Sequence, residues 1–138
     1  MLQIQTHIRP YTVLLHCIII VSISELNGKL VRTPRNTLAK VGESITLECV
    51  TSDEHPQIEW RHYPPRSSEA NPNRLYTGGE VTDVYKTKIS LRRRTRGEIS
   101  LTITKLVLED SGTYECVDES DDVSEKADLV ILGVKLTL

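Results

Sequence analysis

The sequence predicts an all-β fold, built as a sandwich of two sheets packed face to face. Short runs of residues alternate between apolar and polar, which is the pattern of strands that bury one face. Residues that favour turns separate these runs, and no segment keeps helical spacing over ten residues. Short strands with frequent turns are typical of sandwiches, because each sheet must bury its apolar face against another layer.

The first half of the chain contains three expected strands. Ile45, Leu47 and Cys49 alternate with polar neighbours, as in a half-buried strand. The same alternation returns in IEWRHY, where Trp60 shares a face with Ile58. The expected elements, in order, are a strand within 41–52, a loop at 52–57, a strand at 58–63, a proline-rich loop at 64–73 and a hairpin at 74–81 turning at Gly78 and Gly79.

The second half adds four more strands. YKTKISLRRR and EISLTITKL alternate on either side of the basic segment RRTRGE, and VLEDSGTYECVDE combines a turn with a strand. The last strand is expected in KADLVILGVKLTL. The side chains expected to point inward are Ile99, Leu101, Ile103, Tyr114, Cys116, Ala127, Leu129 and Ile131.

The N-terminus differs in composition from the rest of the chain. Arg9 is its only charge before an apolar run of about 13 residues, and small residues follow at Ser22 and Ser24. This order is typical of a secretory signal peptide, which we place at 1–24. The apolar run is short for a membrane span of about 20 residues, and an uncleaved anchor is the alternative.

The cysteine count agrees with secretion. Removal of the signal peptide would take Cys17 away and leave Cys49 and Cys116, an even pair that is expected to form a disulfide in an oxidising compartment. We divide the chain into the signal peptide, a leader at 25–35, one domain at 36–134 and a tail at 135–138. No membrane span is expected after cleavage, so the expected product is secreted and extracellular.

Four motifs together resemble the immunoglobulin superfamily: VGESITLEC, IEW, SLTITKL and DSGTYEC. The resemblance covers about residues 36–134 and implies an immunoglobulin-like Greek-key sandwich. It implies that Trp60 packs on an inter-sheet disulfide between Cys49 and Cys116, with Leu101 in the same core. It also implies that the hydroxyl of Tyr114 bonds the backbone at the turn before its strand.

The same resemblance suggests an ion pair and a subtype. Family members commonly pair the Asp of the last motif with an Arg, and Lys88 stands in that place here, so Lys88 is expected to pair with Asp110. Lysine cannot make a two-pronged contact with a carboxylate. The 67-residue separation of the cysteines leaves room for the extra strands of variable-type domains, while KADLVIL resembles intermediate-set domains. Both subtypes stay open.

The sequence gives little indication of catalysis. His55 and His62 are the histidines left after processing, and neither has a cysteine free to act as a nucleophile. We expect no catalytic residues, no metal site and no cofactor, since no cluster has metal-ligand spacing. The net charge of −2 and the scarcity of aromatic residues do not favour nucleic-acid binding.

Two charged loops are expected at one end of the sandwich. The first is basic and the second acidic, and both lie near the loop at 52–57. Their residues are Arg92, Arg93, Arg94 and Arg96 in the first, and Asp118, Glu119, Asp121 and Asp122 in the second. Such charges are commonly just solvated, but they could also steer a protein partner or bind a glycosaminoglycan.

The open face of the sheet that carries Trp60 and Cys116 is the second candidate surface. Tyrosines, aliphatic residues and charges together suit a protein interface. The candidate residues are Glu59, Arg61, Tyr63, Tyr76, Glu115 and Val117, with Val130 and Leu132 on the same face. An ordinary solvent-facing surface is the alternative.

These observations favour an extracellular, non-catalytic domain in adhesion, receptor modulation or immune recognition. Its expected partner is a secreted or cell-surface protein, or a second copy of the same chain. Two alternatives remain. The chain could bind a glycosaminoglycan through Arg92–Arg96, or it could be a fragment or short isoform of a multi-domain receptor.

Overall fold

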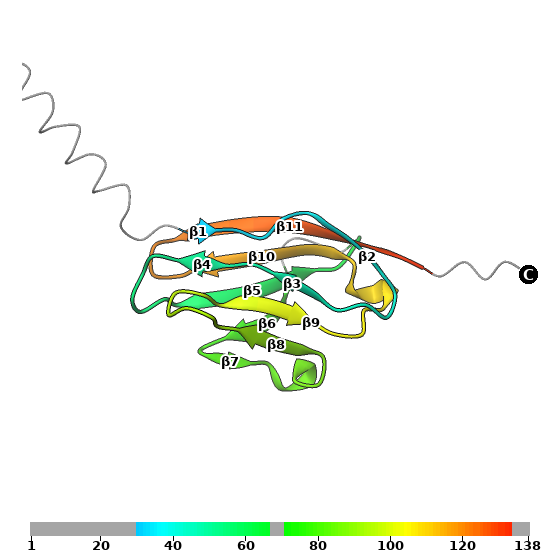
Figure 1. Cartoon of the computed structure of the whole chain (residues 1–138), viewed down its shortest axis with the longest axis horizontal. Helices are drawn as coiled ribbons and strands as arrows, with labels where there is room; N and C mark the ends of the chain where they lie inside the picture. The colour runs from blue at the N-terminus through cyan, green and yellow to red at the C-terminus, as the bar shows by residue number, and fades with distance from the viewer. Residues whose placement is uncertain (1–29, 67–70, 134–138) are drawn as a thin grey trace, which may run out of the picture.

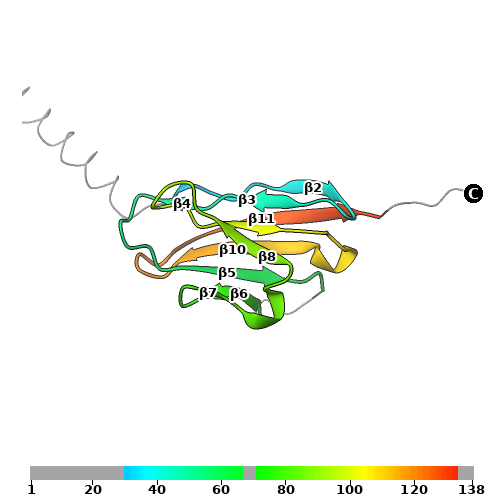
Figure 2. The same cartoon turned by 60° about the horizontal axis from the view of Figure 1, so that its bottom comes forward.

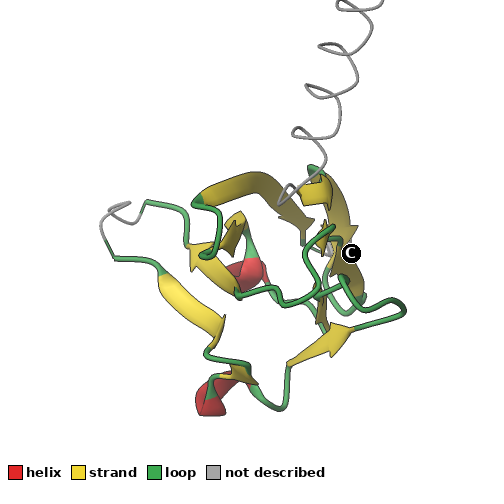
Figure 3. Ribbon diagram, turned by 90° about the vertical axis from the view of Figure 1, so that its left-hand side faces the viewer, coloured by secondary structure: helices red, strands yellow, loops and turns green. Residues whose placement is uncertain are grey.

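Two β-sheets face each other (Figure 1, Figure 3). A disulfide between Cys49 and Cys116 joins them. The structure, a computed structural model, describes residues 30–66 and 71–133. The predicted signal peptide at 1–24 and tail at 135–138 lie outside these residues. Within them, the predicted all-β sandwich with a disulfide between Cys49 and Cys116 is confirmed.

The larger sheet has six strands in the order β2, β11, β10, β5, β6, β7. Their bounds are β2 Thr37–Lys40, β5 Ile58–Tyr63, β6 Asn73–Thr77, β7 Glu80–Val81, β10 Gly112–Asp118 and β11 Val123–Leu132. Neighbouring strands are antiparallel except β2 and β11, which run parallel side by side (Figure 2). The strands β6 and β7 occupy the extra length between the two cysteines, as expected of a variable-type domain.

The smaller sheet has the order β3, β9, β8, and a short pair, β1 with β4, continues beside it. The bounds are β1 Leu30–Arg32, β3 Ile45–Leu47, β4 Val50–Thr51, β8 Ile89–Arg92 and β9 Ser100–Ile103. The strand β1 lies inside the segment 25–35 that we expected to be a leader. The sandwich therefore begins before the predicted boundary at 36, and β1 is too short for alternation to reveal it.

Helical structure in the described residues is limited to two single turns. They are η1, Asp83–Tyr85, and η2, Leu108–Asp110. No helix in this part of the chain is long and apolar enough to cross a membrane. The first turn joins β7 to β8 and the second joins β9 to β10, so each connects one sheet to the other.

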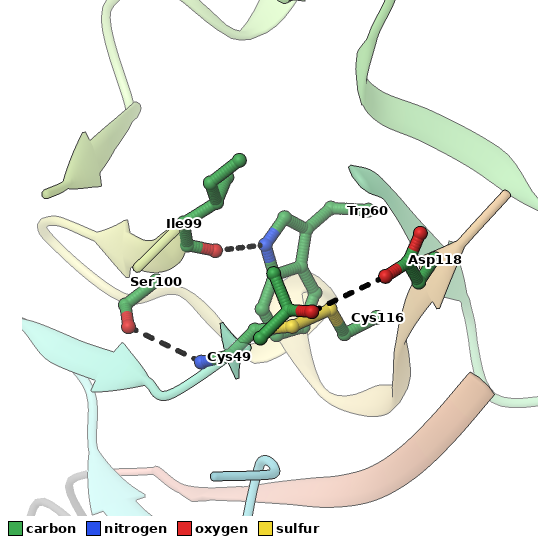
Figure 4. The surroundings of a disulfide bond; sticks show 7 residues. Cys49, Trp60, Ile99, Ser100, Cys116 and Asp118 are labelled. Carbon is green, nitrogen blue, oxygen red and sulfur yellow. Dashed lines mark hydrogen bonds between the residues drawn. A yellow bond between two sulfur atoms is a disulfide. The ribbon is translucent and has the colours of Figure 1, made fainter. Parts of the chain in front are cut away.

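Trp60 and the disulfide form the centre of the core (Figure 4). Trp60 and Cys116 are partners on the neighbouring strands β5 and β10, and both are fully buried, as is Leu101 on β9. The indole N–H of Trp60 donates to the carbonyl of Ile99 at 2.8 Å, which links β5 to the start of β9 in the other sheet. At roughly 25 cal/mol/Å², burying about 200 Å² of indole contributes about 5 kcal/mol.

A second set of contacts fixes the turn before β10. The hydroxyl of Tyr114 donates to the carbonyl of Asp110 at 2.6 Å, and the Asp110 carboxylate lies 2.5 Å from Lys88 Nζ. Gly112 begins β10 with a φ of +132°, and a Cβ there would lie 2.4 Å from the carbonyl oxygen of Tyr63. Only glycine fits this approach, so the Gly of DSGTYEC allows β10 to start close to β5.

An irregularity in β6 corrects one prediction. Trp60 pairs with Tyr76 while Arg61 pairs with Arg74, so Leu75 is an extra residue on β6. The side chains of both Leu75 and Tyr76 are buried in the core. Tyr76 was expected on the outer face, and this expectation was wrong, because an extra residue breaks the strict alternation of side chains.

His62 is buried beside the turn that precedes β10. Its ring stacks on Tyr114 with 4.3 Å between ring centroids, and its Nε2–H donates to the carbonyl of Ser111 at 2.9 Å. Burial lowers the pKa of His62, and the hydrogen bond to Ser111 and the charge of Asp110 oppose this without reversing it. The folded protein therefore favours the neutral imidazole.

We predict that His62 lowers the free energy of unfolding as the pH falls. A histidine in the unfolded chain has a pKa of about 6.5, so the unfolded state takes up a proton before the folded state does. The stability that neutral His62 contributes is complete above about pH 6.5 and is lost as the pH falls through the lower folded value. Urea denaturation between pH 7 and pH 5 should show a shallower decline for His62→Gln than for the native chain.

The matched control for this experiment is His55→Gln. His55 is exposed in the loop at 52–57, so this variant should keep the native pH dependence. Equal declines in the native chain and in His62→Gln would contradict the prediction.

Candidate functional site

A row of polar side chains crosses the outer face of the six-stranded sheet. We call it the polar ladder, and it runs over β11, β10, β5 and β6. Its members are Lys126, Glu115, Tyr63, Arg61, Glu59 and Arg74. At the β11 end, Lys126 Nζ lies 5.0 Å from the centroid of the Tyr63 ring, and the Tyr63 hydroxyl donates to Glu115 Oε1 at 2.7 Å.

Arg61 connects the two halves of the polar ladder. Its Nη1 lies 3.6 Å from Glu115 Oε1, and its Nε donates to Glu59 Oε1 at 2.8 Å. Arg74, on the neighbouring strand, places Nε 3.3 Å from the same Glu59 oxygen. Each member thus holds its neighbour in place, and the row is ordered before any partner arrives.

Three residues of the predicted face are less accessible than expected. Glu59 is 2% exposed, and Glu115 and Val117 are also buried. Alternation along a strand indicates which face a side chain occupies, but long neighbours on adjacent strands decide how deeply it lies. Arg61 and Tyr63 contact the two carboxylates directly, so the accessible surface here is formed by the basic and aromatic members of the ladder.

The electrostatics of the ladder keep Glu59 ionised. Burial acts to raise the pKa of Glu59, but hydrogen bonds from Arg61 and Glu119, with the charges of Arg61 and Arg74, outweigh burial and hold the pKa below its ordinary value. The pKa of Glu119 is raised by its hydrogen bond with Glu59, by burial and by the Glu59 charge. Of these two carboxyls, Glu119 is therefore the one that takes up a proton first.

An exposed apolar strip lies beside the ladder. Leu38 on β2 and Val130 on β11 are partners in the parallel pair, and Leu132 follows Val130 two residues later on the same face. They are 67%, 52% and 47% exposed, respectively. We call these three residues the apolar strip. Sequence analysis had placed Val130 and Leu132 on this face, but Leu38 was missed because the four residues of β2 are too few to show a pattern.

Main-chain hydrogen bonds attach both charged loops to residues near 52–57. The N–H of Thr51 donates to the carbonyl of Gly97 at 2.9 Å, which attaches the arginine loop (residues 92–97) to β4. The N–H of Glu119 donates to the carbonyl of Gln57 at 2.9 Å, which joins the acidic loop to the loop at 52–57. Both loops are therefore attached to the segment that runs from β4 through residues 52–57.

Much of the positive charge of the arginine loop is compensated within the domain. Glu98 is buried, and its Oε1 accepts hydrogen bonds from Arg92 Nε at 2.9 Å and Arg94 Nε at 3.3 Å. Burial acts to raise the pKa of Glu98, and the hydrogen bonds from Arg92 and Arg94 lower it to a net value below the ordinary one. Arg93 donates to the Tyr76 hydroxyl at 2.8 Å, whereas Arg96 is exposed.

The acidic loop brings together carboxylates that the sequence did not indicate as a group. Oxygens of Asp53, Asp118 and Asp121 lie within 4.8 Å of one another. These residues come from two loops far apart in sequence, so no local spacing could reveal the cluster. Asp118 is fully buried and already accepts hydrogen bonds from Thr51 and Ser120. We therefore assign no ion to this cluster.

Comparison with known protein families gives a direct match. Residues 32–132 match the family described as the immunoglobulin V-set domain. The chain is 33% identical over 97 residues to the human Cell surface A33 antigen. The matched region covers 62% of this chain and 30% of that protein. The chain is 29% identical over 92 residues to the human Cytotoxic and regulatory T-cell molecule, covering 66% and 21%.

A relative from an insect is also similar. Interference hedgehog of Drosophila yakuba is 32% identical over 76 residues, which cover 51% of this chain and 9% of that protein. The chain therefore matches less than a third of the length of each of these three relatives. The similarity concerns one domain and not the whole of those proteins.

Solved structures share the fold at lower identity. Murine CRIg superposes with a TM-score of 0.59 at 13% identity, covering 77% of this chain and 98% of that one. An immunoglobulin domain in the complex of titin M10 with obscurin like 1 superposes with a TM-score of 0.57 at 18% identity, covering 79% and 97%. At this identity the likeness concerns the sandwich alone.

We predict that Glu59 stabilises the folded domain. Replacing it by Gln leaves Arg61, which is largely covered, without its nearest counter-charge. The free energy of unfolding should fall by about 2 kcal/mol, which is less than for a fully buried pair because Arg74 is solvated. Urea denaturation at pH 7 measures this loss.

Arg74→Gln is the control, because it removes the solvated partner of the same carboxylate. It should cost less than about 1 kcal/mol. A Glu59→Gln variant as stable as the native chain would show that the polar ladder does not hold the face together.

Proposed function

This chain belongs to the immunoglobulin V-set domain family, and from that premise we propose that it is a non-catalytic extracellular recognition domain. We infer that it binds another protein through the outer face of its six-stranded sheet. The observation that carries this proposal is the apolar strip beside the polar ladder. A small exposed apolar group next to ordered polar residues has the composition of a protein-binding surface.

The apolar strip supplies binding energy to such a contact. Burying the exposed parts of Leu38, Val130 and Leu132 against a partner removes apolar surface from water, at roughly 25 cal/mol/Å². The strip lies on two hydrogen-bonded strands, so the backbone that carries its side chains is already ordered. Little conformational entropy is then lost when the partner binds.

The polar ladder supplies orientation. Its members already satisfy one another, so a partner need not complete any buried charge. Arg74 and Lys126 at its two ends remain accessible for hydrogen bonds to the partner. A partner that buried Arg74 or Lys126 without a counter-charge or acceptor would bind more weakly, which gives the surface selectivity.

Secretion is part of the proposal. The sequence of residues 1–24 is typical of a signal peptide, and a disulfide such as Cys49–Cys116 persists in oxidising compartments. One relative is named a cell surface antigen. These points support an extracellular location for the domain.

The structure favours a protein partner over a glycosaminoglycan. Arg92 and Arg94 both bond Glu98, and Arg93 bonds the Tyr76 hydroxyl, so most of the arginine loop is already engaged. The acidic loop lies at the same end and repels sulfated polymers. A glycosaminoglycan is therefore kept as an outcome of the following test.

We predict that Val130→Glu abolishes recognition. The charge would stand in the middle of the apolar strip and would have to be desolvated on binding, which costs several kcal/mol. Staining of a panel of cells with the tetramerised secreted chain should fall more than about tenfold for this variant. Staining by the native chain should survive enzymatic removal of heparan sulfate.

Val84→Glu is the matched control, since Val84 is 77% exposed in η1, away from the strip. It should stain cells as the native chain does. Native staining by Val130→Glu, or loss of native staining after heparan sulfate is removed, would contradict a protein partner at this face.

A further inference from the structure

A polar cleft of about 540 Å³ opens at the edge of the smaller sheet. It lies between the segment that leaves β1 and the outer edge of β3. We call it the edge cleft, and its polar lining consists of Arg32, Thr33, Arg35, Thr37, Thr46 and Glu48. It is separate from the apolar strip, which lies on the outer face of the other sheet.

The edge cleft exists because the chain changes sheets. Strand β1 pairs with β4 as far as Arg32, and β2 begins at Thr37 in the other sheet. Pro34 stands between them and is buried. Proline has no N–H to donate to a sheet, so a continuation of β1 along β3 would lack a main-chain donor at this residue. Strand β3 is left as the edge of its sheet, paired with β9 alone.

The free edge of β3 presents main-chain donors and acceptors to the cleft. The carbonyl of Cys49 accepts the N–H of Ile99, so Cys49 directs its main-chain groups at the β9 side. Successive residues of a strand point these groups in opposite directions. The N–H and C=O groups of Thr46 and Glu48 therefore point away from β9, toward the edge cleft.

The charge around this edge is positive. Arg32 Nη1 lies 3.9 Å from Glu48 Oε2, but Glu48 is shared with Arg92, whose Nη2 is 3.5 Å from the other oxygen. Arg35 is exposed, and no carboxylate of the described residues forms an ion pair with it. Arg92 is also bonded to Glu98, at 2.9 Å. Three guanidinium groups thus meet two carboxylates at this edge, and Arg35 supplies the excess positive charge.

We propose that the edge cleft binds an extended acidic peptide segment of another protein, which adds to β3 as an antiparallel strand. The segment would take the place that a straight continuation of β1 would occupy. Its main chain would bond Thr46 and Glu48, and acidic side chains at alternate positions, about 7 Å apart, would face Arg32 and Arg35.

The sign of the charge decides between partners. Charged residues beside a free edge generally oppose pairing with a further strand. Here the uncompensated charges are all positive, so they repel basic segments and attract acidic ones. The same residues that protect the edge from unspecific pairing therefore select the acidic partner.

The test uses nuclear magnetic resonance on the whole chain and an end-blocked heptapeptide that alternates glutamate and valine. Saturable shifts are expected for the amide signals of Thr46 and Glu48. Arg35→Glu should weaken binding about tenfold, because a repulsion replaces an attraction. Arg96→Glu changes an exposed arginine of the arginine loop by the same charge and should leave the affinity unchanged.

A second peptide separates strand addition from simple charge attraction. Methylation of alternate peptide nitrogens removes the main-chain donors and keeps every carboxylate, so this peptide should not bind. Equal binding of the methylated peptide would overturn the proposal, as would the absence of saturable shifts at Thr46 and Glu48 or equal weakening by Arg96→Glu.

Discussion

The packing of Trp60 against the Cys49–Cys116 disulfide is the constraint on which the rest of the structure depends. The disulfide joins the two sheets, and the indole N–H of Trp60 reaches from β5 to the carbonyl of Ile99 beside β9. Because Cys116 and Trp60 are direct partners, the register between β5 and β10 cannot slip without pulling one of them out of the core. A slip of one residue would reverse the facing of every side chain on both strands.

The fixed register determines what the outer face can offer. It places Glu59, Arg61 and Tyr63 opposite Val117, Glu115 and Thr113, so acids and bases meet across strands. The charged groups of the resulting polar ladder are paired within the domain, so a partner would not have to supply counter-charges for them. The exposed apolar surface is left at the β2 side, where we propose that a protein partner binds.

Sequence reasoning could predict which face of a sheet a side chain occupies. It could not predict how deeply that side chain is buried, or where a strand carries an extra residue. Alternation and the Cys–Trp–Tyr–Cys pattern predicted the sandwich and its core correctly. Tyr76 was misplaced because an extra residue in β6 has no signal in the sequence. Glu59 and Glu115 were placed on the correct face, but the long side chains of neighbouring strands cover them. The grouping of Asp53 with Asp118 depends on how two distant loops meet, which only the folded chain shows.

The crossover at Pro34 links the two candidate surfaces. By leaving the smaller sheet, the chain closes the edge of β11 with β2 and brings Leu38 beside Val130, which completes the apolar strip. The same departure leaves β3 unpaired and opens the edge cleft. The change of sheet around Pro34 therefore affects both surfaces, because main-chain pairing that the smaller sheet lacks is made in the larger one. A strand cannot cover two edges, so this domain protects one edge with β2 and the other with charge.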